Sequence, residues 1–105
     1  MPVKETTITA SIIKLLKTVP NSFVKKIHGG RMQGGGIPDI YFTCKWIEGH
    51  SVWFEVKRPG YEATELQLYT MKRLNNAGCT SIIVRSRADV LNWLIENEIV
   101  AKDKK

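Results

Sequence analysis

The stretch from Gly36 to Lys57 constrains the fold more than any other part of the chain. It holds two runs rich in β-branched and aromatic residues, with a turn signal at Glu48-Gly49 between them. Such runs predict two strands that pair as an antiparallel hairpin about this turn. The chain therefore has a β-hairpin at its centre.

The end of the second run separates an apolar face from a polar one. Strand side chains alternate between faces, so Phe54 and Val56 point one way, whereas Glu55 and Lys57 point the other. We expect the first face to join the core. The second face then carries a carboxylate beside an amine at an exposed strand end.

The hairpin also brings Asp39 to this end of the strand. With the turn at Glu48-Gly49, the residues opposite Lys57 and Arg58 are those around Pro38 and Asp39. Asp39, Glu55 and Lys57 are thus predicted to converge at the open end of the hairpin.

Two carboxylates held close together repel each other unless a cation lies between them. A hard divalent ion with oxygen ligands, Mg²⁺ by preference, fits this requirement. The structural alternative is an ordinary exposed ion pair between Glu55 and Lys57, which contributes little. A Pro-Asp pair or a Glu-x-Lys triplet alone occurs by chance in roughly a third of chains of this length. The joint arrangement therefore carries the prediction.

Pro38-Asp39 followed by Glu55-Val56-Lys57 resembles the motif of the PD-(D/E)xK nucleases. The longer pattern resembles one branch, the VRR-NUC (virus-type replication-repair nuclease) domains, and the likeness runs from about Glu5 to Leu94. It rests on three segments, Gly36-Ile37-Pro38-Asp39-Ile40, Phe54-Glu55-Val56-Lys57-Arg58-Pro59-Gly60 and Thr64-Glu65-Leu66-Gln67.

The resemblance implies a metal-dependent deoxyribonuclease. One or two Mg²⁺ or Mn²⁺ ions would be held by Asp39, Glu55 and the Val56 carbonyl, and an acidic residue in the first helix would contribute to the site. Glu5 is the only acid before Asp39 and takes that role. Lys57 would orient the attacking water and stabilise developing negative charge.

The same resemblance places Gln67 beside the active site. Its spacing from Thr64 also predicts a capping box, in which Gln67 is the reciprocal cap of a helix. The two roles are compatible at a helix N-terminus that faces the strand ends.

The remaining segments predict an α/β fold with the order αβββαβα, a small mixed sheet flanked by helices. The resemblance implies that this is a restriction-endonuclease-like core. Apolar spacing predicts a first helix with Ile8, Ile12, Leu15, Leu16 and Val19 on one side; a second with Leu68, Met71, Leu74 and Ala77; and a third, capped by Ser86, with Val90, Leu91, Leu94 and Ile95. Strands are expected at 23–28 and 79–84.

Composition indicates one domain, residues 1–105, with a frayed basic tail at about 101–105. Sixteen Lys and Arg against ten acids give a net charge of +6, which suits a polyanionic partner. A glycine-rich run at 29–36 is flanked by cations. We expect Lys25, Lys26, Arg31 and Arg58 to contact DNA phosphates.

Other classes of protein are disfavoured. No apolar run approaches the ~20 residues of a membrane helix, and the glycine run lacks the Gly-Lys-Ser or Gly-Lys-Thr of a nucleotide-binding loop. Cys44 and Cys79 have no metal-ligand spacing, and we expect them to be reduced in an intracellular protein. We therefore expect a cytoplasmic protein without a membrane or nucleotide-cofactor partner.

Several functions stay open within this frame. A chain of 105 residues leaves little room for a sequence-recognition domain, which favours cutting of branched DNA such as four-way junctions over restriction-type cleavage. Paired cuts at a junction favour a homodimer. The alternatives are a monomeric nickase of flaps or forks and a non-catalytic DNA-binding or accessory module of a replication or repair complex.

Overall fold

The computed structural model describes residues 3–28 and 35–99 and confirms the predicted order of elements. The helices and strands are α1 (Glu5–Leu16), β1 (Ser22–Lys26), β2 (Ile40–Cys44), the 3₁₀ helix η2 (Lys45–Ile47), β3 (Val52–Val56), α2 (Glu65–Asn76), β4 (Thr80–Val84) and α3 (Arg87–Glu96). Arg31 and the predicted tail at 101–105 lie outside the described residues.

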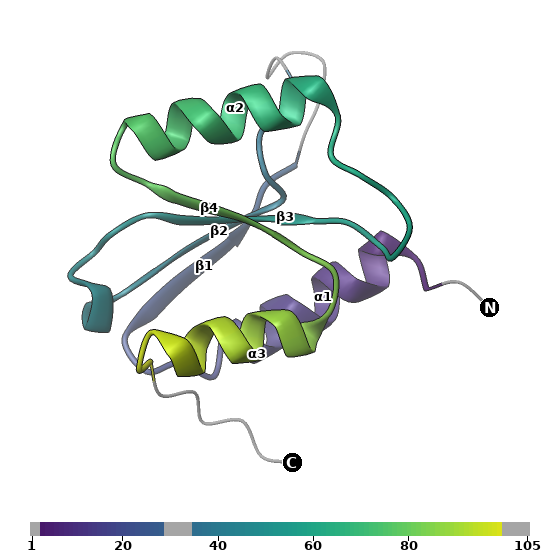
Figure 1. Ribbon diagram of the computed structural model, residues 1–105. Helices are drawn as coiled ribbons and strands as arrows, with labels where there is room; N and C mark the ends of the chain where they lie inside the picture. Colours follow the sequence, from purple (N-terminus) through teal and green to yellow (C-terminus); the bar gives the residue numbers. More distant parts are fainter. Residues whose placement is uncertain (1–2, 29–34, 100–105) are drawn as a thin grey trace.

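The strands form one mixed sheet in the order β1-β2-β3-β4. The pairs β1/β2 and β2/β3 are antiparallel, whereas β4 joins β3 in parallel after the crossover through α2. As Figure 1 shows, α2 lies on one face of the sheet, and α1 and α3 lie on the other. Both faces are therefore covered at β4, by α2 on one side and α3 on the other.

The main core fills the space between the sheet and the pair α1 and α3. It takes the inward positions of β2 and β3, such as Phe42 and Phe54, and the apolar side of α1. The Trp93 ring of α3 packs edge-on against Phe42 and Phe54, at centroid distances of 6.5 and 5.5 Å. This core fixes β3, whose end carries the Glu-x-Lys sequence.

The hairpin is confirmed, but its predicted register is wrong by two residues. Ile40 pairs with Phe54, so continuing the ladder places Asp39 opposite Glu55 instead of opposite Lys57 or Arg58. The reason is the connection, which contains η2 and a left-handed Glu48 instead of a tight turn. A shift of two residues keeps every side chain on its predicted face, because the side-chain period of a strand is two.

The predicted caps of α2 and α3 are confirmed, but parts of their predicted apolar faces are wrong. Thr64 and Gln67 form the capping box of α2, and the Ser86 hydroxyl accepts from the Asp89 N–H at the start of α3. However, Leu68 and Ala77 are exposed, and Ile95 is 63% exposed. Each of these helices packs on one side only, so its buried side is narrower than the apolar spacing suggests.

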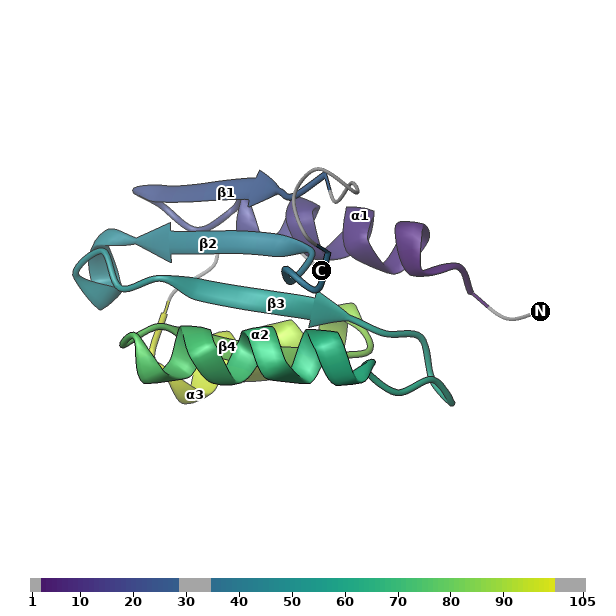
Figure 2. The same cartoon turned by 90° about the horizontal axis from the view of Figure 1, so that it is seen from above.

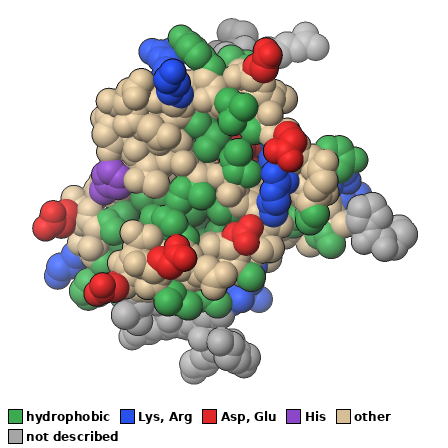
Figure 3. All heavy atoms as spheres, viewed as in Figure 1, with side chains coloured by type: hydrophobic (Ala, Val, Ile, Leu, Met, Phe, Trp, Pro, Cys, Tyr) green, Lys and Arg blue, Asp and Glu red, His purple; other side chains and the backbone are tan. Residues whose placement is uncertain are grey.

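Strand β4 is an edge of the sheet whose two ends are hydrogen-bonded by side chains. Asn75 Oδ1 accepts from the Ser81 N–H at 3.0 Å, and Asp89 Oδ2 accepts from the Arg85 N–H at 2.8 Å. Apolar side chains gather over this edge, between α2 and α3 (Figure 3). The side-chain bonds limit how many backbone groups the edge offers to another strand. Within the described ranges, no helix is long and apolar enough to cross a membrane.

Candidate active site

Asp39 is anchored to the end of β3 by its side chain. Its Oδ2 accepts a hydrogen bond from the Val56 backbone N–H at 2.8 Å. The carboxylate thereby accepts the hydrogen bond that a backbone carbonyl of β2 would otherwise accept from β3, at the point where β2 begins and β3 ends. This bond fixes Asp39 next to Glu55, as the sequence predicts.

The same ladder position leaves the Val56 carbonyl without its usual partner. In a strand, the N–H and C=O of one residue point the same way, so the Val56 carbonyl faces β2 as its N–H does. Continuing the register places Pro38 opposite Val56. Proline has no N–H to donate, and therefore the Val56 oxygen is suited to bind another ligand.

Glu55 is a buried carboxyl in an unfavourable environment for its charge. The side chain is 2% exposed, and Oε1 has no hydrogen-bond partner. Burial, followed by the charge of Asp39 and a hydrogen bond with its side chain, raises the pKa of Glu55 from 4.5 to about 8. Lys57 opposes this shift, and its Nζ lies 4.0 Å from Glu55 Oε2.

The prediction of an exposed strand end is wrong for Glu55. The sequence separates the two faces of β3 correctly, but Glu55 is buried on the face of the sheet that also carries α2. Lys57 is also largely enclosed, with 12% of its side chain exposed. The pair therefore lies in a site of low dielectric, where its electrostatic interactions are stronger than on a surface.

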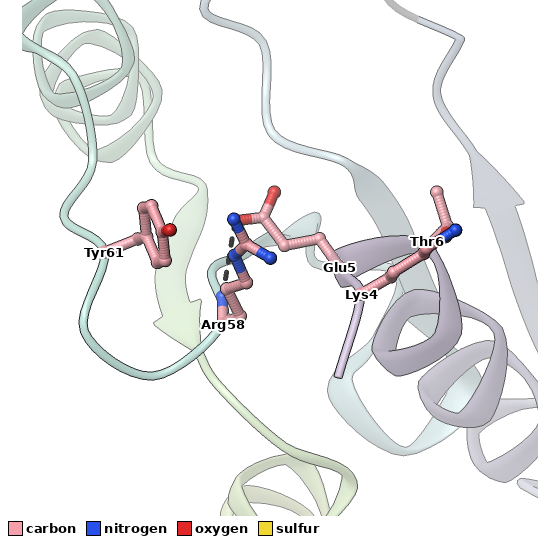
Figure 4. Close-up of a pocket in the computed structure, with 5 residues that line it drawn as sticks. All are labelled: Lys4, Glu5, Thr6, Arg58 and Tyr61. Atoms are coloured by element: carbon pink, nitrogen blue, oxygen red, sulfur yellow. Dashed lines mark hydrogen bonds between the residues drawn. The ribbon is translucent and has the colours of Figure 1, made fainter. Parts of the chain in front are cut away.

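Glu5 approaches this site from the start of α1. Its Oε2 accepts from the Arg58 backbone N–H at 3.3 Å, and its charge adds to the rise in the pKa of Glu55. Figure 4 shows Glu5 pointing toward Arg58 across a hollow of about 290 Å³, which Lys4, Thr6 and Tyr61 also line. Glu5 thus joins the first helix to the segment that follows β3.

Tyr61 and Arg85, which had no predicted role, organise the segment after β3. The Arg58 guanidinium lies over the Tyr61 ring, 4.1 Å from its centroid. Arg85 Nη1 donates to the carbonyls of Arg58 and Tyr61, and Arg85 Nη2 pairs with Glu62 at 3.3 Å. No spacing in the sequence indicates these contacts, because Arg85 directly follows β4 and is distant in sequence from Arg58 and Tyr61.

Gly36 lets the segment that leads into Asp39 pass close to α2. Its φ is +74°, and an added Cβ would lie 2.7 Å from Leu66 Cγ and 2.9 Å from Thr70 Oγ1 of α2. Gln67, on the same helix, uses its Oε1 to accept from the Thr64 N–H at 2.8 Å. The cap role of Gln67 is confirmed, and its catalytic role stays a prediction.

We expect Gly36→Ala to destabilise the fold by about 2 to 4 kcal/mol, because it adds a clash with α2 to a left-handed backbone. Gly49→Ala is the matched control, since φ is +77° there but nothing lies within 4 Å of the added atom. That change should cost about 1 kcal/mol. Urea unfolding of both variants measures the difference, and equal losses would show that the α2 contact is unimportant.

The donor set suits a hard divalent cation. Asp39 and Glu55 supply two carboxylates, Glu55 Oε1 is an unpartnered buried oxygen, and the Val56 carbonyl faces the same strand. A cation there would offset the burial and the Asp39 charge that raise the pKa of Glu55. Within 3–28 and 35–99, no three His, Cys, Asp or Glu side chains are grouped as metal ligands, so Glu5 is not gathered with the other two.

The fold is shared with solved VRR_NUC structures. One, described as "VRR_NUC domain", has a TM-score of 0.70 and 22% identity over 88% of this chain and 94% of its own. Another, "VRR_NUC domain protein", has a TM-score of 0.71 and 12% identity over 92% and 89%. No family model matches the sequence, and no curated protein matches it. At these identities, the likeness establishes the fold and confirms the predicted architecture.

Proposed function

We propose that this chain is a divalent-metal-dependent endonuclease that hydrolyses phosphodiester bonds in DNA. The observation that carries the proposal is the buried Glu55 carboxyl, held beside Asp39 and Lys57 with one oxygen unpartnered. Stability alone does not account for two neighbouring carboxyls at a strand end, because ionising both is unfavourable even with Lys57 beside Glu55, as the raised pKa of Glu55 indicates. The nuclease activity suggested by the similar VRR_NUC structures agrees with this chemistry.

Asp39, Glu55 and the Val56 carbonyl would hold one Mg²⁺ or Mn²⁺, and Glu5 would complete the site or support a second ion. A bound ion of this kind lowers the pKa of its water and neutralises charge on a phosphoryl oxygen. In the chain itself, the Val56 N–H keeps Asp39 in place at 2.8 Å, and Arg58 N–H does the same for Glu5 at 3.3 Å.

Lys57 is the residue best placed to act on the water and the phosphate. Its Nζ lies 4.0 Å from Glu55 Oε2, and its enclosure strengthens the field of the ammonium group. Gln67 would contribute from the start of α2, where its Oε1 is already fixed by the cap. Its amide nitrogen is the part of the side chain left to meet a substrate.

Phosphate contacts of Lys25, Lys26, Arg31 and Arg58 would supply most of the DNA affinity, so binding should survive chelation and weaken steeply with salt. Replacing Lys25, Lys26 and Arg31 by Gln should lower the slope of log affinity against log salt by roughly 2 to 3. Lys14→Gln on the exposed side of α1 is the control. Anisotropy titrations of labelled DNA at several salt concentrations decide this, and an unchanged slope would exclude these three contacts.

Branched DNA is the proposed substrate, with a homodimer supplying the two cuts that a four-way junction requires. The test is incubation with Mg²⁺ or Mn²⁺ and labelled duplex, flap, fork and four-way junction DNA, with a chelator control. We expect cutting of branched forms that chelation abolishes. Binding without cutting on every form would contradict the proposal and indicate a non-catalytic module. A sedimenting mass of 11.9 kDa for the free protein, together with one chain per DNA in the complex, would exclude the homodimer.

A further inference from the structure

A groove opens beside the carboxylates, between α2 and the sheet. It has a volume of about 360 Å³ and is lined by Ile37, Trp53, Thr70, Arg73, Leu74 and Ala77. Trp53 precedes Glu55 by two residues on β3, so both side chains project from the same face, about 7 Å apart along the strand. A ligand in the groove would therefore be adjacent to the site of hydrolysis.

An aromatic row continues from the groove across the sheet. The Tyr41 ring lies between Trp53 and Phe23, with centroid distances of 5.0 and 6.1 Å and edge-on geometry. Phe23 is 57% exposed. In the described chain, α2 packs mainly against β4, and Figure 2 shows no helix over β1 and β2 on this face. Tyr41 and Trp53 are partly buried, so the row is most open to a partner at Phe23.

The charges around the row are positive. Lys25 pairs with Tyr41 in the ladder and projects from the same face, and Arg73 lines the groove. Strands β1, β2 and β3 contain one acid, Glu55, which belongs to the proposed site. The rings are flanked by Lys25 and Arg73, and the acids beside them, Asp39 and Glu55, belong to the proposed cation site. Such a row matches a single-stranded nucleic acid, whose bases stack on aromatic rings while cations neutralise its backbone.

We propose that this groove and its aromatic row bind unpaired bases of the DNA substrate next to the bond that is cut. The inference rests on the proposed nuclease function and, among the branched forms proposed above, favours DNA with a single-stranded segment, such as a flap or fork, over a fully paired four-way junction. Paired bases of a continuous duplex are stacked within the helix and cannot enter the groove. The competing occupant is a second copy of the chain, which the test below distinguishes.

The test measures binding of labelled oligothymidylate in a chelator, where no cutting occurs. Trp53→Leu keeps an apolar side chain but removes the stacking ring, and we expect roughly tenfold weaker binding. Phe23→Leu should also weaken binding. Because Phe23 is exposed, this variant tests the proposal even if Trp53→Leu does not fold. Trp46→Leu is the control, because Trp46 is 53% exposed, close to the 57% of Phe23, but lies in the connection between β2 and β3.

A second arm changes the DNA instead of the protein. An abasic strand keeps the phosphates and removes the bases, so the wild-type protein should bind it about as weakly as Trp53→Leu binds oligothymidylate. Blunt duplex should bind wild type and Trp53→Leu equally. Equal affinity of wild type for the abasic and intact strands would overturn the proposal.

Other outcomes separate this inference from the nuclease activity. If Trp53→Leu changes the sedimenting mass and leaves oligothymidylate affinity unchanged, the groove is a self-association surface and the proposal is overturned. Base-dependent binding by a protein that never cuts would support the groove while contradicting the nuclease function. Cutting without base-dependent binding would support the nuclease function and contradict the proposed role of the groove.

Discussion

Replacing Glu55 by Gln, or Asp39 by Asn, should lower the rate of DNA hydrolysis by about three orders of magnitude or more. Each change keeps the shape of the side chain but removes a negative oxygen from the proposed cation site. Lys57→Met should also abolish most activity, because it removes the ammonium group 4.0 Å from Glu55. Single-turnover rates at saturating Mg²⁺ measure these effects.

The double variant of Asp39 and Glu55 should resemble the single variants. Residues that act as one unit are strongly non-additive, since removing one member already disables the site. Glu62→Gln is a suitable control, because Glu62 is an exposed acid that pairs with Arg85. Wild-type rates in the double variant would contradict the assignment of the active site.

Glu55→Gln should also stabilise the metal-free protein at alkaline pH, by an amount on the order of a few kcal/mol. The pKa of Glu55 is about 8 in the folded protein and near 4.5 in the unfolded chain. Between pH 4.5 and about 8 the folded state therefore binds more protons than the unfolded chain. The free energy of unfolding falls as the pH rises through this range. The neutral amide of the variant escapes this loss.

Thermal unfolding of both proteins across pH 4 to 9 checks the sign. The midpoints should coincide near pH 4 and differ by roughly 5 to 15 °C above pH 8. Asp39→Asn should reduce the pH dependence, because the Asp39 charge is the largest cause of the raised Glu55 pKa after burial. Parallel curves for wild type and Glu55→Gln would show that the carboxyl is not destabilised by its surroundings.

Addition of Mg²⁺ at pH 8 should then separate the two proteins in the opposite direction. A cation beside Glu55 lowers its pKa and stabilises wild type by mass action. Glu55→Gln lacks the carboxylate and should gain much less.

Local signals predicted much of this fold. The capping box at Thr64 and Gln67 and the cap at Ser86 depend on residues three apart, so spacing is enough to find them. The alternation along β3 likewise separates Glu55 from Phe54 and Val56. These features are decided within one turn or one strand, where the sequence holds all of the relevant residues.

The misjudged features depend on contacts between distant elements. The two-residue error in register comes from η2, which changes the geometry of the connection. The burial of Glu55 depends on the elements that pack around the end of β3, and the bonds of Arg85 to the segment after β3 depend on the position of β4. Neither the periodicity nor the spacing of residues in the sequence predicts where these distant elements lie relative to one another.

Calorimetric titration of Mn²⁺ into the metal-free protein tests the central claim that Asp39 and Glu55 form one cation site. Wild type should bind one or two ions per chain and release protons near pH 7, since Glu55 is protonated before the ion enters. Asp39→Asn and Glu55→Gln should lose this binding, whereas Glu62→Gln should keep it. Identical isotherms for wild type, Asp39→Asn and Glu55→Gln would contradict the claim.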